Sequence, residues 1–286
     1  MRQQQLAFAS QEPMPDPYIV EGPAVISFSG GRTSAFLLRQ ILDRGLAPDV
    51  HVLFANTGKE RPETLEFVHA CETGWGIQVH WVEYRPGDEE RKARYEEVDY
   101  ERANRDGGPF DMLIAHRERL PNPIMRICTQ ELKVRVMREW MKDRGYQHWS
   151  MVVGLRADEP RRVARMNGLN EQAKERWTTV MPLWKAGVEE EDVLGFWKEQ
   201  AFDLQLRTWE GNCDLCFLKS HAKKVRIAQD SPQLAAWWLA KEEASLEPFR
   251  RTAKPYAAIV DEARRLPLVR IDGALDDDLG DCLCTD

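Results

Sequence analysis

The sequence contains no run of 18 or more apolar residues, which excludes a membrane-spanning helix and a membrane partner. Its opening segment, MRQQQLAFASQEPMPDPY, also lacks the long apolar stretch of a secretory signal. We therefore expect a cytoplasmic protein in which residues 1–20 form a flexible, polar tail. Cysteine is scarce, with six in 286 residues. Because a cytoplasmic chain of this size rarely keeps disulfides, clustered cysteines indicate metal or redox chemistry.

Acidic residues outnumber basic ones, and the formal net charge of −7 argues against bulk binding to nucleic acid. The basic residues are nevertheless concentrated in one region. Residues 113–176 carry 14 basic and 8 acidic side chains, a net charge of +6. This basic region predicts contact with a polyanion such as a nucleic acid, although solvated helix faces explain the same pattern equally well.

Apolar and amphipathic segments alternate along the first half of the chain. They predict strands at 24–28, 50–55, 77–83 and 148–154, and helices at 34–44, 62–73 and 129–143. This alternation predicts an α/β fold with a parallel sheet flanked by helices. Residues 84–123 are charged and broken by glycine and proline, which indicates a long insertion or a lid. Residues 186–270 predict a mostly helical region, and residues 271–286 an acidic tail containing a Cys-x-Cys pair.

The segment VISFSGGRTSAFLL, residues 25–38, joins the first predicted strand to the first predicted helix. Two glycines allow close approach of the backbone to a ligand, and a helix N-terminus offers free N–H groups to an anion. Ser29, Thr33 and Ser34 add hydroxyl donors. The spacing matches neither GxxxxGK[ST] nor GxGxxG. The segment therefore predicts a phosphate site of another type, and a tight turn with a serine cap is the alternative.

The SGGxxS pattern after a first strand resembles the PP-loop of the ATP pyrophosphatase superfamily. Further segments resemble the phosphoadenosine phosphosulfate (PAPS) reductase family, in the order in which that family carries them. FANTG and ERPET, at 54–58 and 60–64, resemble its DTGxxxPET segment, with Asn56 where the family usually has Asp. RICTQELK, at 126–133, resembles its Cys-x4-Lys segment. GLRADEPRR, at 154–162, resembles its GxRxxES-xR segment, with Pro160 in place of Ser, and GNCDLC, at 211–216, resembles its late Cys-x2-Cys.

This resemblance implies a Rossmann-like sheet of the HUP/PP-loop type over residues 21–185, with an adenine nucleotide at the carboxyl ends of the strands. The residues implied in phosphate binding are Ser29, Gly30, Gly31, Thr33 and Ser34. The residues implied near the adenosine are Asn56, Thr57 and Gly58. The cations implied for anionic groups of the substrate or nucleotide are Lys133, Arg156, Arg161 and Arg162. For each arginine, a surface ion pair is the alternative.

The Cys213-x2-Cys216 pair suits half a zinc site, a redox pair or half of a cluster site. Related reductases with an iron–sulfur cluster carry a Cys-Cys pair at the position of Cys128. In this chain Thr129 replaces the second cysteine of that pair. The resemblance therefore implies a [4Fe-4S] cluster on Cys128, Cys213 and Cys216. Such clusters usually take four thiolates, so one iron stays open or Cys282 or Cys284 completes the set.

Other roles remain open for the two tail cysteines. Cys282 or Cys284 can act as a nucleophile on a mobile tail, relay sulfur or be incidental thiols of a solvated tail. Cys71 and the Trp237-Trp238 pair lie in helical patterns that predict packing in the core.

Three functions follow from the resemblance. The first is ATP-dependent adenylation with Mg²⁺, followed by sulfur transfer to a tRNA base or a DNA phosphate. The second is reduction of adenylyl sulfate or PAPS, with a thiol nucleophile and release of sulfite. The third is a non-catalytic nucleotide or cluster sensor. The complete SGGxxS pattern favours ATP, because the reductase substrate has no β- and γ-phosphates. The candidate catalytic residues are Lys133, Arg156, Cys282 and Cys284; a sulfur-donor or reductant protein is an expected partner, and the oligomeric state stays open.

Overall fold

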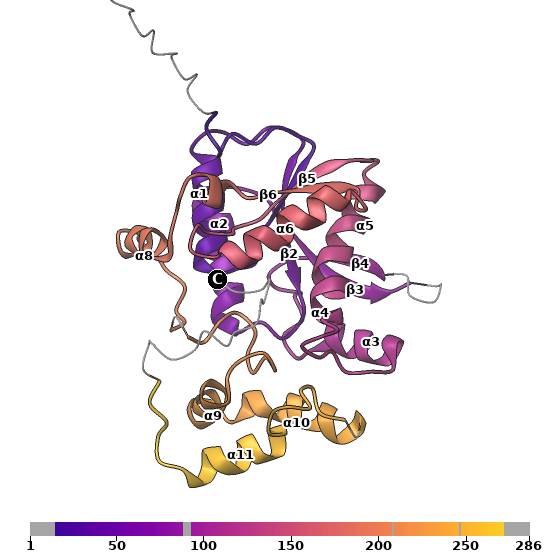
Figure 1. Cartoon of the computed structure of the whole chain (residues 1–286), viewed down its shortest axis with the longest axis vertical. Helices are drawn as coiled ribbons and strands as arrows, with labels where there is room; N and C mark the ends of the chain where they lie inside the picture. Colours follow the sequence, from indigo (N-terminus) through magenta and orange to yellow (C-terminus); the bar gives the residue numbers. More distant parts are fainter. Residues whose placement is uncertain (1–14, 88–92, 208, 246, 272–286) are drawn as a thin grey trace, which may run out of the picture.

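The computed structural model describes residues 15–87, 93–207, 209–245 and 247–271 (Figure 1). Its centre is a six-stranded sheet of order β4-β3-β2-β1-β5-β6. The strands are β1 (Ala24–Ser27), β2 (Val50–Asn56), β3 (Val79–Pro86), β4 (Ala93–Val98), β5 (Trp149–Val152) and β6 (Trp177–Val180). All neighbours pair in parallel except β3 and β4, which are antiparallel. The expected α/β fold with a mostly parallel sheet is confirmed.

Helices cover both faces of this sheet (Figure 1). In the α/β part they are α1 (Arg32–Leu42), α2 (Pro62–Trp75), α3 (Gly108–Arg117), α4 (Ile127–Thr129), the π-helix η1 (Gln130–Arg135), α5 (Val136–Asp143), α6 (Pro160–Gln172), α7 (Pro182–Lys185) and α8 (Glu190–Lys198). The C-terminal helices are α9 (His221–Asp230), α10 (Gln233–Ser245) and α11 (Tyr256–Arg265). The expected helical C-terminal region is therefore present.

Successive strand residues face opposite layers of the core. In β1, Ile26 packs in the layer of α1, α2 and α8, whereas Val25 packs in the layer of α3, α5 and the C-terminal helices. Both side chains are buried. A parallel strand that is buried on both faces has no polar face, which explains the continuous apolar run in this part of the sequence.

The region expected to be an insertion or lid, residues 84–123, contains regular structure that the prediction did not give it. Strand β3 continues to Pro86, β4 returns antiparallel to it, and α3 follows. The charged residues misled the prediction because β4 is an edge strand with a solvated face. Arg85 and Glu96, for example, form an ion pair between the two strands at 2.7 Å. Strand β6 and helix α6 were also missed.

The C-terminal helices share a hydrophobic core with one face of the sheet. Phe110 of α3 packs edge-on against Trp237 and Trp238 of α10, with ring centroids 5.1 and 5.9 Å away. The predicted packing role of this tryptophan pair is confirmed, as is that of Cys71, which is fully buried. None of the helices in the described part of the chain is long and apolar enough to cross a membrane. Cys282 and Cys284 lie outside the described residues.

Candidate functional site

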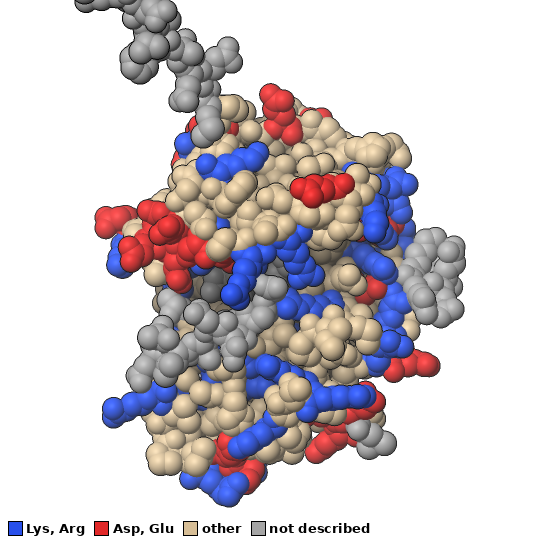
Figure 2. Space-filling view, in the orientation of Figure 1, with Lys and Arg blue, Asp and Glu red and all other residues tan. Residues whose placement is uncertain are grey.

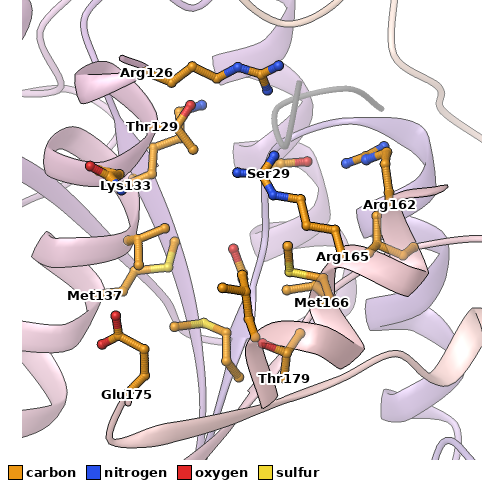
Figure 3. Close-up of a pocket in the computed structure, with 18 of the residues that line it drawn as sticks. Ser29, Arg126, Thr129, Lys133, Met137, Arg162, Arg165, Met166, Glu175 and Thr179 are labelled. Atoms are coloured by element: carbon orange, nitrogen blue, oxygen red, sulfur yellow. The ribbon is translucent and has the colours of Figure 1, made fainter. Parts of the chain in front are cut away.

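A cavity of about 830 Å³ opens at the carboxyl ends of the sheet strands (Figure 3). Ser27 and Ala55 line it from the ends of β1 and β2, and Met151 and Thr179 line it from β5 and β6. Strand β1 is the switch point of the sheet, because β2 and β3 lie to one side of it and β5 lies to the other. Open α/β sheets bind ligands in the crevice at such a point.

The cavity lining is cationic. Four of its side chains are basic, Arg126, Lys133, Arg162 and Arg165, whereas Glu175 is the only carboxylate among its described lining residues. In Figure 3 the arginines lie around Ser29, and Glu175 lies at the other end of the cavity. On the face shown in Figure 2, Lys and Arg side chains gather around a hollow in the middle of the molecule. Such a lining suits an anionic ligand.

The predicted phosphate loop forms one wall of this cavity. The Ser29 amide and hydroxyl both donate to Ser34 Oγ, at 3.2 and 2.9 Å, and Ser34 Oγ donates to the Gly31 carbonyl at 3.0 Å. Ser29 and Ser34 line the cavity. The α1 N-terminus follows directly, and its first N–H groups have no partner within the helix. The Ser29 amide and both hydroxyls therefore donate within the turn, and the donors left for a ligand at this wall are the N–H groups at the start of α1.

Gly30 allows the loop to pack tightly. Its φ is +79°, a left-handed conformation that favours glycine. A Cβ at this position would lie 2.7 Å from Thr64 Cγ2 and 2.9 Å from Val68 Cγ2, both on α2. Gly30 thus has a packing role beneath the loop. Any other residue would place its Cβ against α2 and would rarely adopt this φ.

The predicted arginines fall into different environments. Arg156 donates to Thr33 Oγ1 at 3.2 Å and pairs with Asp158, so it fixes the start of α1 rather than lining the cavity. Arg161 is exposed and lies outside the lining. Arg162 lines the cavity and forms an ion pair with Glu159. Arg165 lines it as well and was missed, although its helical spacing of three from Arg162 was a signal.

A second, smaller cavity of about 50 Å³ lies beside the first. Cys128, Cys213 and Cys216 all line it, so the structure brings together the three cysteines predicted as metal ligands. Thr129 and Lys133 line both cavities and form a shared wall between them. Lys133 lies on η1, and π-helical segments inside helices are frequent at functional sites.

Three thiols around one apolar cavity fit a thiolate-held iron–sulfur cluster, in which different cysteines bind different irons. They do not form a ready site for a single ion. Among the described residues, no group of three His, Cys, Asp or Glu side chains is arranged to hold a metal ion. The residues that would hold a cluster are therefore Cys128, Cys213 and Cys216, and the described lining of the cavity offers no fourth thiol.

Glu60 connects the parts of the site, and the sequence interpretation gave it no role. Its carboxylate accepts hydrogen bonds from the Thr57 amide and hydroxyl at 2.8 and 2.7 Å. It also pairs with Lys133 Nζ at 3.2 Å and lies 4.0 Å from Cys213 Sγ. Because this side chain is fully buried, it fixes the shared wall against the Cys-x2-Cys loop.

Asn212 makes a second connection between the two cavities. Its Nδ2 donates to the Ser29 carbonyl at 3.0 Å, and its own carbonyl accepts from the Arg61 amide at 2.8 Å. The phosphate loop, the loop after β2 and the Cys-x2-Cys loop are therefore held to one another directly.

The residues expected near the adenosine do not line the large cavity. Asn56 is fully buried, and its Nδ2 donates to Glu83 Oε1 at 2.7 Å and to the Asn104 carbonyl at 2.8 Å. Thr57 lines the thiol cavity instead, and Gly58 packs against Asn104 with φ +76°. Glu83 thus explains why Asn56 suits this position where the family usually has Asp: the Asn56 amide can donate to the Glu83 carboxylate, which an Asp carboxylate could not do.

We expect Asn56→Asp to lower the free energy of unfolding at neutral pH by about 3 kcal/mol, because it buries a second carboxylate against Glu83. Like charges raise the pKa of such a pair in the folded state, so the deficit should shrink as the pH falls and the pair takes up a proton. Urea unfolding between neutral and acidic pH measures this. The double variant Asn56→Asp/Glu83→Gln should recover part of the loss, whereas an Asn56→Asp variant of unchanged stability would contradict the assignment.

This chain matches a known protein family and is similar to a phage protein. Residues 23–204 match the family described as the phosphoadenosine phosphosulfate reductase domain. The chain is 33% identical over 212 residues to the uncharacterized nin region protein ORF290 of Escherichia phage lambda, covering 71% of this chain and 68% of the phage protein.

Two solved structures show a distant likeness in fold. A phosphoadenylyl-sulfate reductase from Candida auris in a phosphate complex has a TM-score of 0.41 and 15% identity, covering 67% of this chain and 82% of the reductase. The U34-tRNA thiolase NcsA from Methanococcus maripaludis, with its [4Fe-4S] cluster, has a TM-score of 0.40 and 14% identity, covering 92% of this chain and 78% of the thiolase.

Proposed function

The chain belongs to the phosphoadenosine phosphosulfate reductase domain family, and within it we propose an ATP-using enzyme that transfers sulfur to a nucleic acid. The observation that carries this proposal is the wall of Thr129 and Lys133 between the large cationic cavity and the cavity of three cysteines. A phosphate-bearing ligand and a sulfur centre at these positions would be neighbours. The complete Ser29-Gly30-Gly31-x-x-Ser34 turn supports a triphosphate over a sulfate ester.

The residues of the chain would divide the work as follows. Ser29, Ser34 and the first amides of α1 bind the phosphates, and Arg162 and Arg165 offset their charge. An acceptor oxygen then attacks the α-phosphorus, and the bond to pyrophosphate breaks. In the second step a sulfur nucleophile attacks the activated atom, and AMP leaves. Lys133 lies where it can contact anionic groups in either cavity.

Two bound groups would assist. Mg²⁺ would be held mainly by the triphosphate and water, because the described lining beside Ser29 offers hydroxyls rather than carboxylates. A [4Fe-4S] cluster on Cys128, Cys213 and Cys216 would supply an iron that has no protein thiolate and can bind sulfur. The sulfur itself must come from a donor, such as a partner protein or inorganic sulfide.

A nucleic-acid acceptor is supported by the rim of the large cavity. Arg126 and Arg165 line it within the basic region 113–176. Beside them Ile124 is 94% exposed, although it stands on an ordered turn in which Asn122 Oδ1 accepts from the Ile124 and Met125 amides at 3.0 and 2.8 Å. Cationic side chains around an exposed apolar residue suit a polyanion whose bases can pack their ring faces on that residue.

Reduction of adenylyl sulfate or PAPS is the second candidate, and the family match itself favours it. In that reaction a thiolate attacks the sulfur, the S–O bond to AMP or its 3′-phosphorylated form breaks, and an external thiol reductant then releases sulfite. Cys282 and Cys284 are candidate nucleophiles for it.

Parallel assays of anaerobically purified protein separate the candidates. With ATP, Mg²⁺, sulfide and tRNA or DNA, we expect pyrophosphate release that depends on the nucleic acid and incorporation of sulfur into it. Sulfite release from adenylyl sulfate or PAPS with a thiol reductant would instead favour the reductase. Nucleotide binding with neither product would contradict both and favour a sensor. Lys133→Met is the control for background activity, because it removes the ammonium between the two cavities.

A further inference from the structure

An unusual amount of positive charge is buried immediately after the Cys-x2-Cys loop. Lys219, Lys223 and Lys224 are 7%, 7% and 2% exposed. Lysine side chains are almost never buried to this extent unless they are paired. Lys223 and Lys224 also lie in the first turn of α9, and this first turn contains no acidic residue. Because the N-terminal end of a helix dipole is positive, cations there are unfavourable unless negative charge is close by.

Lys219 has an evident role, whereas Lys224 does not. Lys219 Nζ donates to the Cys213 carbonyl at 2.7 Å and so closes the Cys-x2-Cys loop. Lys224 has neither a hydrogen bond nor an ion pair from its ammonium to any other described residue. Its contact is with the face of the Tyr256 ring, whose centroid lies 5.5 Å from Nζ.

The charges that face Lys224 do not balance it. Glu242 lies near and supplies one negative charge, and its two carboxylate oxygens accept hydrogen bonds from the backbone amides of Phe249 and Tyr256. Arg250 adds further positive charge, so the one carboxylate faces two cations. Burial, with a smaller contribution from Arg250, lowers the pKa of Lys224 to about 8. The other neighbour that can carry negative charge is the sulfur of Cys216. It is close because the hydroxyl of Tyr256, whose ring Lys224 faces, donates to the carbonyl of Leu215, the residue before Cys216.

We infer that Lys224 is the counter-cation of the sulfur centre at Cys216 and sets how readily that centre accepts an electron. This inference rests on the cluster of the proposed function. An ammonium held in a site of low dielectric stabilises negative charge nearby far more than a surface lysine does. The reduced form of a cluster carries one more negative charge than the oxidised form, so a fixed cation beside a ligand thiolate favours reduction. Lys224 is then a positioning residue, which acts through Cys216 without contacting substrate.

Lys224→Met tests this, because methionine fills a similar volume without charge. In anaerobically purified, cluster-loaded protein we expect the equilibrium constant for reduction to fall about tenfold, a decrease in midpoint potential of about 59 mV for a one-electron couple. A redox titration followed by absorbance and electron paramagnetic resonance measures it. Lys224→Arg keeps the charge and should stay close to wild type. Lys198→Met, which removes an exposed charge on α8, should have no effect.

Stability provides a second readout. In cluster-free protein, Lys224→Met should raise the midpoint of thermal unfolding, because it removes a buried unpaired charge, and cluster loading should cancel that gain. A structural role through Tyr256 alone would instead lower the midpoint in both forms and would overturn the inference. If the wild-type protein contains iron and sulfide but its midpoint potential is the same in Lys224→Met as in Lys198→Met, the inference is overturned and the proposed function is unaffected. Absence of iron from wild type would overturn both.

Discussion

Replacing Cys213 by alanine should remove the iron from anaerobically purified protein and abolish its broad absorbance at about 400 nm. Cys213 lines the thiol cavity with Cys128 and Cys216, and these are the thiols that the described part of the chain places there. Loss of one thiolate would leave two described ligands, which is too few to retain a four-iron cluster. We expect iron content to fall at least tenfold, as measured by metal and sulfide analysis of the same sample.

A matched control is available within the chain. Cys71 is fully buried on α2, on the opposite face of the sheet from the thiol cavity, and burial raises the pKa of its thiol well above the usual range. Cys71→Ala should therefore lose some stability and no iron. Zinc in place of iron in the wild-type protein, or full iron content in Cys213→Ala, would contradict the cluster assignment. Iron loss in Cys282→Ala or Cys284→Ala would identify a fourth ligand in the tail.

Replacing Ser29 by leucine should weaken ATP binding by about 100-fold, equivalent to about 2.7 kcal/mol of binding free energy. The leucine side chain would project into the cavity at the phosphate loop and would remove the hydroxyl that donates to Ser34 Oγ. Isothermal titration calorimetry with ATP and Mg²⁺ measures this effect.

Ser29→Ala separates loss of the hydroxyl from filling of the cavity, and we expect a tenfold weaker affinity or less, since the backbone donors of α1 remain. Thermal unfolding of both variants checks that the fold is intact. An unchanged ATP affinity in a folded Ser29→Leu protein would place the nucleotide elsewhere.

The sheet and the glycine turn before α1 could be predicted because their signals are local. The strand that contains Val25 and Ile26 is buried on both faces and reads as a continuous apolar run, and the glycine turn at Gly30 and Gly31 directly precedes an apolar helix pattern. The grouping of Cys128 with Cys213 and Cys216 was available from the family resemblance rather than from spacing, because 85 residues separate Cys128 and Cys213.

The connections between these parts could not be predicted, because they depend on tertiary contacts. Nothing local distinguishes Glu60 from the acidic residues around it, yet its burial makes it the link between Lys133 and Cys213. Likewise the motif predicts that Asn56 contacts the nucleotide, whereas its side-chain amide donates to Glu83 and to the Asn104 carbonyl. Helical spacing linked Arg165 to Arg162, but only the orientation of α6 shows that this face lines the cavity and that Arg161 lies outside it.

The central claim is that a nucleotide binds directly beside a sulfur-held iron centre. The measurement that tests it most directly is the electron paramagnetic resonance spectrum of the reduced, anaerobically purified protein before and after saturation with ATP and Mg²⁺. We predict that the nucleotide shifts the spectrum in the wild-type protein and leaves it unchanged in Ser29→Leu. A spectrum that does not respond to bound nucleotide, or a protein that carries no iron, would contradict the account.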